Sequence, residues 1–81
     1  MSKEYYKKKI VDLRANLLKE KEAKKKDNAR YADLIKGASS ANTKASYRKR
    51  KIDAAVGHDR KIESIKRLID SAKDNLKRES K

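Results

Sequence analysis

The pattern that decides the fold lies in residues 55–76, AVGHDRKIESIKRLIDSAKDNL. Apolar residues and one histidine recur here at alternating steps of three and four, which is the heptad spacing of a helix that packs along one side. The positions are Ala55, His58, Ile62, Ile65, Ile69, Ala72 and Leu76. Most residues between them are charged or small, so the stretch predicts an amphipathic helix with one narrow apolar seam.

Strong helix formers extend this helix in both directions, and we predict that it spans residues 44–79. Gly57 interrupts it, at a cost of roughly 0.8–1 kcal/mol relative to Ala. We interpret Gly57 as a tolerated weak point. The alternative is a close helix crossing or a hinge at this position.

A second helix is predicted over residues 3–36, with Ser2 as its N-cap. Its apolar stripe follows the same spacing and then turns polar before it resumes near the end of the helix. The first, apolar part consists of Tyr6, Ile10, Leu13 and Leu17. The polar part consists of Glu20, Lys24 and Asp27. The last part consists of Tyr31 and Leu34, with Ile35 beside them.

Residues 37–43 are small and polar and predict the turn between the helices. Gly37 suits the left-handed position that often follows a helix. Ser39, Ser40 and Asn42 are all suitable caps for the helix that follows, and the sequence does not choose among them. Two helices of similar length joined by a short turn predict a single all-α domain over residues 1–81, an antiparallel hairpin that resembles a coiled coil.

Folding about the turn places the apolar parts of both helices at the end that carries the termini. One such hairpin has a small core, so we expect it to pair with itself, for example into a four-helix bundle, or with another protein. The predicted partner interface is Ile10, Leu13, Leu17, Ile62, Ile65, Ile69 and Leu76. With 46% charged residues, disorder is the alternative, although the absence of Pro and the regular apolar spacing oppose it.

The chain contains few of the residues and motifs that catalytic sites use. The sequence has no Cys, one His and no Gly-rich phosphate loop, so we predict a protein that is not an enzyme and needs no cofactor, metal ion or small-molecule substrate. Across the hairpin from His58 we expect Glu20 and Asp27. This group predicts either a polar, pH-sensitive site or a histidine that only packs against Lys or Glu stems.

Positive charge dominates, with 25 Lys and Arg against 12 Asp and Glu and a net charge of +13. Between Asp33 and Asp53 there is no acid at all. The basic residues of that stretch are Lys36, Lys44, Arg48, Lys49, Arg50 and Lys51. Basic and hydroxyl side chains beside a helix N-terminus attract anions, so a second hypothesis is binding of DNA or RNA through phosphate contacts.

Residues 38–79, ASSANTKASYRKRKIDAAVGHDRKIESIKRLIDSAKDNLKRE, resemble a coiled-coil hairpin module of bacterial defence proteins, which often precedes a TIR or other effector domain. The resemblance lies in Ser39, Ser40, Thr43, Ser46 and Arg48, followed by a helix rich in Lys, Arg and Ile. It implies an adaptor, or a mimic encoded by a mobile element or phage. The two-helix form is also similar to small partner proteins of bacterial type VII secretion, although a Trp-x-Gly turn is missing.

No apolar run approaches the ~18 residues of a membrane span. The first residues, Met1 to Glu4, lead directly into charged sequence without the apolar core of a signal peptide. We therefore expect a location in the cytoplasm of a bacterial host cell.

Overall fold

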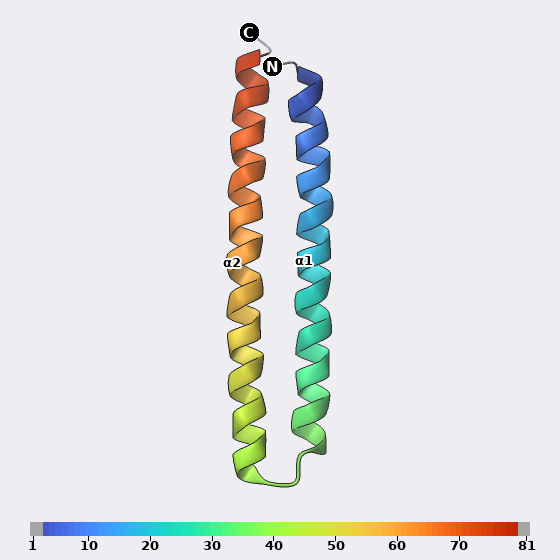
Figure 1. Ribbon diagram of the computed structural model, residues 1–81, viewed down its shortest axis with the longest axis vertical. Coiled ribbons are helices and arrows are strands. Elements are labelled where there is room, and N and C mark those ends of the chain that lie inside the picture. Colours follow the sequence, from blue (N-terminus) through green and yellow to red (C-terminus); the bar gives the residue numbers. More distant parts are fainter. Residues whose placement is uncertain (1–2, 80–81) are drawn as a thin grey trace.

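The computed structural model describes residues 3–79 and shows two long helices side by side (Figure 1). Helix α1 spans Lys3–Gly37 and α2 spans Ala41–Glu79. The chain reverses between them, so the helices are antiparallel and both termini lie at the same end. The hairpin extends over 62 × 14 × 12 Å along its three principal axes. The all-α hairpin predicted from the sequence is confirmed, while the predicted N-cap, Ser2, lies outside the described residues.

The turn is shorter than predicted, because α1 continues through Gly37 and α2 already begins at Ala41. Gly37 does not adopt a positive φ, so the prediction of a left-handed residue there is wrong. The helix ends instead in a tighter step, in which the Ala38 N–H donates to the Ile35 carbonyl at 3.3 Å. A three-residue step of this kind satisfies the last carbonyls without a left-handed residue.

Ser40 caps α2, which decides among the three residues that the sequence left open. Its Oγ accepts a hydrogen bond from the Thr43 N–H at 3.1 Å and donates one to Thr43 Oγ1 at 2.7 Å. The bond from the third helical residue back to the cap is the arrangement that satisfies a free N–H of the first turn.

The core lies near the end of the hairpin that carries the termini. Among residues 3–79, the buried apolar side chains are Ile10, Ile62, Ile69 and Ala72. Tyr6, Leu13, Leu17, Ile65 and Leu76 flank them half-buried. The predicted division into an apolar end and a polar middle is thus confirmed.

Near the turn the seam departs from the predicted positions. Ile35 faces α2 while Leu34 is 39% exposed, and Lys51 faces α1 while Ile52 is 63% exposed. An α-helix has 3.6 residues per turn, so a strict seven-residue pattern drifts around it by about 20° per heptad. Over several heptads this drift moves the inward position to a neighbouring residue.

Gly57 lies in open space, since a Cβ built on it would meet no atom within 4 Å. A close helix crossing at this glycine is therefore excluded. The φ of Gly57 is not positive either, so the backbone there suits any L-residue.

Gly57→Ala is expected to raise the free energy of unfolding by roughly 0.8–1 kcal/mol, because Ala costs less backbone entropy in a helix. Urea unfolding followed by circular dichroism at one protein concentration measures the change. An unchanged or lower stability would mean that the position serves as a hinge and not as a weak point.

Candidate functional site

A charged group occupies the seam in the middle of the hairpin. Glu20 and Asp27 continue the inward steps of Leu13 and Leu17 on α1, and two helical turns separate them on one side of that helix. His58 occupies the matching inward position on α2, one step before Ile62. All three side chains are partly buried, with exposed fractions of 18% for Glu20, 33% for Asp27 and 15% for His58.

His58 bridges the two carboxylates through both nitrogens of its ring. Nδ1 lies 2.5 Å from Glu20 Oε1, and Nε2 lies 2.6 Å from Asp27 Oδ2. A carboxylate only accepts hydrogen bonds, and a neutral imidazole has a single N–H. Two such bonds at once therefore require the imidazolium form, which donates from both nitrogens. We refer to His58, Glu20 and Asp27 as the histidine clamp.

The hydrogen bonds of the clamp favour the charged forms of both His58 and Asp27. The hydrogen bond with Asp27, and next the one with Glu20, raise the pKa of His58 above its ordinary value of 6.5, against a smaller opposing effect of burial. The bond to His58 in turn lowers the pKa of Asp27, and the charge of Arg30 lowers it further. Arg30 Nη2 lies 3.4 Å from Asp27 Oδ1.

A second polar bridge joins the helices close to the clamp. Lys24 Nζ donates to Asp59 Oδ1 at 2.6 Å, although Asp59 remains 55% exposed. The direct bonds confirm that Glu20 and Asp27 face His58, so the alternative of a histidine packed only against side-chain stems is wrong. The middle of the hairpin is held by charge, whereas the end that carries the termini is held by packing.

The clamp is a connection between helices and is poorly arranged for catalysis or metal binding. Its carboxylates lie on opposite sides of the ring and cannot converge on one ion. Within residues 3–79, no group of three or more His, Cys, Asp or Glu side chains is placed to hold a metal ion. With both nitrogens donating, the imidazolium also has no free lone pair to act as a general base.

The predicted anion-binding residues do not form one site. Lys44 and Lys51 are half-buried on the side of α2 that faces α1, whereas Lys36, Arg48, Lys49 and Arg50 are exposed. Arg50 also lies over the Tyr47 ring, at 5.9 Å from its centre. The structure thus separates an inward pair from four exposed residues.

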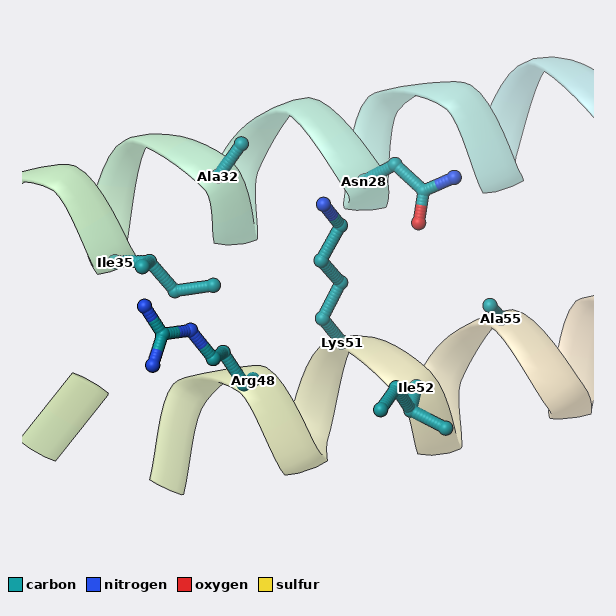
Figure 2. Close-up of a pocket in the computed structure, with 7 residues that line it drawn as sticks. All are labelled: Asn28, Ala32, Ile35, Arg48, Lys51, Ile52 and Ala55. Carbon is teal, nitrogen blue, oxygen red and sulfur yellow. The ribbon is translucent and has the colours of Figure 1, made fainter. Parts of the chain in front are cut away.

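A groove between the helices near the turn was missed by sequence reasoning (Figure 2). Its lining residues are Asn28, Ala32 and Ile35 of α1 with Arg48, Lys51, Ile52 and Ala55 of α2. A signal was present, because the four residues of α2 follow the spacing i, i+3, i+4, i+7 of one helix face. The heptad interpretation began at Ala55 and did not extend to this face.

The seven residues predicted as a partner interface, from Ile10 to Leu76, pack between α1 and α2 of the same chain. Three of them, Ile10, Ile62 and Ile69, are buried there, and Leu13, Leu17, Ile65 and Leu76 are half-buried. Much of their surface is thus used within the chain, and contact with a further molecule through these residues remains a prediction.

Comparison with known proteins leaves the family of this chain open: no protein-family model, curated protein or solved structure matches it. The resemblances drawn from the sequence remain predictions. Neither helix of the described residues contains a stretch long and apolar enough to cross a membrane.

The clamp makes the stability of the hairpin depend on pH. The raised pKa of His58 means that its contribution is complete below 6.5 and is lost as the pH rises through the folded-state value. The lowered pKa of Asp27 means that its contribution is complete above 3.8 and is lost as the pH falls through the folded-state value. The free energy of unfolding is therefore expected to be highest between about pH 4 and 6.5 and to decline on the alkaline side.

Urea titrations at a series of pH values measure this profile. His58→Gln should remove the alkaline decline, because Gln does not titrate. Lys24→Gln is the matched control, since it removes the other inter-helix bridge and keeps the clamp, so the decline should persist. A wild-type profile that is flat from acid to alkaline pH would contradict the role of the clamp.

Proposed function

We propose that this chain is a non-enzymatic helical interaction protein, whose hairpin packs against further helices of a second copy or of a partner protein. One observation carries the proposal. Helices of 35 and 39 residues bury only four apolar side chains among residues 3–79, while Val11, Leu18 and Ile52 remain 64%, 63% and 63% exposed. Burying a side chain of this size contributes about 1.5–3 kcal/mol, and this gain supports further helix contact.

These exposed residues extend along one side of the hairpin. Val11 and Leu18 are seven positions apart on α1, and Ala32 lies two heptads further on the same side. Ala32 shares the groove with Ile52 of α2, and Val56 follows Ile52 by one helical turn. We call Val11, Leu18, Ala32, Ile52 and Val56 the apolar face.

The proposal thus moves the external contact from the seam to the apolar face. A change within the seam, such as Ile65→Asp, would place an unpaired charge between α1 and α2 and unfold the hairpin itself. Residues of the apolar face are already exposed, and substituting them leaves that packing intact. Adaptor modules of bacterial defence and partner proteins of type VII secretion, which the sequence resembles, are both compatible with a function through helix contact.

A photo-crosslinking amino acid at Leu18 or Ile52 is expected to capture a protein. The captured protein is a second copy if the purified chain forms crosslinked dimers, and a partner if crosslinks form only in the cells that make the chain. The same amino acid at Lys8 or Asp74, on the outward sides of α1 and α2, is the control and should capture little. Equal capture from all four positions, or from none, would contradict the proposal.

Binding of DNA or RNA is the second candidate, and the acid-free stretch around the turn favours it. Three of its basic residues, Lys36, Lys49 and Arg50, are exposed outside the groove. Lys36 lies in the last turn of α1, and Lys49 and Arg50 lie about two turns into α2, so all three present positive charge in the half of the hairpin that contains the turn. Binding of this kind tolerates any base sequence and weakens with salt.

Replacing Lys36, Lys49 and Arg50 together by Gln is expected to weaken nucleic-acid binding. It should also reduce the slope of log affinity against log salt by up to about 0.9 for each phosphate that the variant no longer neutralises. Fluorescence anisotropy with random duplex and single strands measures both quantities. The variant with Gln at Lys7, Lys8 and Lys9 removes equal charge at the other end of α1. Equal weakening in the two variants would show that net charge alone matters, and no binding of the wild type at low salt would remove this candidate.

A further inference from the structure

The groove near the turn has apolar walls. Ala32 and Ile35 of α1, together with Ile52 and Ala55 of α2, line a space of about 530 Å³ between the helices (Figure 2). The histidine clamp fills the seam half-way along the hairpin, and among residues 3–79 no fully buried apolar side chain lies between the clamp and the turn. The groove is therefore the place where an added apolar stripe would supply what the seam lacks.

The charge of the groove is positive only. Arg48 and Lys51 are its charged lining residues, and neither forms an ion pair with any residue in the described range 3–79. Figure 2 shows the Lys51 side chain reaching from α2 toward α1, and this residue is half-buried. An ammonium group that is partly removed from water and lacks an acidic neighbour is stabilised by a carboxylate supplied from outside.

A second copy of the chain fits this groove poorly. Two copies that met groove to groove would bring Arg48 and Lys51 of each close to the same residues of the other. Like charges at close range are unfavourable, and the net charge of +13 on each chain adds to the repulsion.

A nucleic acid also fits less well than a protein. Phosphates would neutralise Arg48 and Lys51 but would leave Ile52 and the alanines uncovered, and no aromatic side chain lines the groove for a base to stack on. An α-helix with apolar residues at i, i+3 or i+4, and i+7 covers such walls, and acidic residues beside that stripe reach the two cations.

From these observations, and resting on the proposed function, we infer that the groove is the docking site for an acidic amphipathic helix of a partner protein. The apolar stripe of that helix packs on Ala32, Ile35 and Ile52, and its Asp or Glu side chains pair with Arg48 and Lys51. The bound helix completes a three-helix arrangement at the turn end of the hairpin, where no apolar side chain of residues 3–79 is fully buried by α1 and α2 alone.

The test uses the full chain and a designed helical peptide with a Leu stripe flanked by Glu, and measures binding by titration calorimetry and by NMR shifts. The wild type is expected to bind this peptide, with shifts concentrated at the groove residues. A peptide with Lys in place of every Glu has the same apolar stripe and should bind at least roughly tenfold more weakly, because its charges oppose Arg48 and Lys51.

Matched variants locate the binding site. Arg48→Glu with Lys51→Glu should weaken binding roughly tenfold or more, whereas Lys49→Glu with Arg50→Glu changes the net charge equally outside the groove and should have a much smaller effect. Ile52→Ser should also weaken binding, and Leu68→Ser, which alters another exposed apolar residue, should not. Circular dichroism of each variant verifies that the hairpin is intact.

Several outcomes would overturn the inference. Equal weakening by the two charge-reversal pairs would mean attraction by net charge without a groove site. Dimers that Ile52→Ser abolishes would make a second copy the occupant, and binding of an RNA strand but not of the acidic peptide would make it a nucleic acid. If the peptide fails to bind while Leu18 still crosslinks to a protein, the groove assignment fails and the proposed interaction function stands.

Discussion

Two helices packed side by side share one seam, and the properties of this chain follow from what that seam contains. Only inward positions of α1 and α2 can be removed from water, since every other residue lies on a curved outer surface. Here the seam is apolar near the termini and charged in the middle. The histidine clamp takes positions where isoleucine or leucine would otherwise extend the core, so hydrophobic packing stabilises only part of the length of the hairpin.

A clamp of this kind fixes alignment more than it adds stability. Moving three partly buried polar groups out of water is costly, and their mutual attraction largely offsets that cost. The geometry is demanding, however, because both ring nitrogens must meet a carboxylate at the same time. A shift of α2 along α1 by one turn would leave His58 or a carboxylate unpaired, so the clamp selects one register of the helices.

The same limited seam explains why so much apolar surface remains outside. Val11, Leu18 and Ile52 cannot reach the seam, which is already occupied, and they have no other element of the described chain to pack against. In a monomer that acts alone, polar residues at these positions would keep less apolar surface in contact with water. The exposure of these apolar side chains on one side of the hairpin is the observation on which the proposed contact with another protein rests.

The sequence by itself determined the two helices, their antiparallel pairing and the apolar end of the seam, because each depends on helical periodicity and on folding about one turn. It placed His58 across from Glu20 and Asp27 but left open whether they bond, which the structure decided. Tertiary structure alone decided where the periodicity drifts: which of Leu34 and Ile35 turns inward, and that Lys51 faces α1 while Ile52 points away. It also decided that Ser40 is the cap and that Gly37 stays helical. A sequence pattern gives the angle of a residue around its own helix, whereas burial depends on the position of the second helix, and only packing fixes that position.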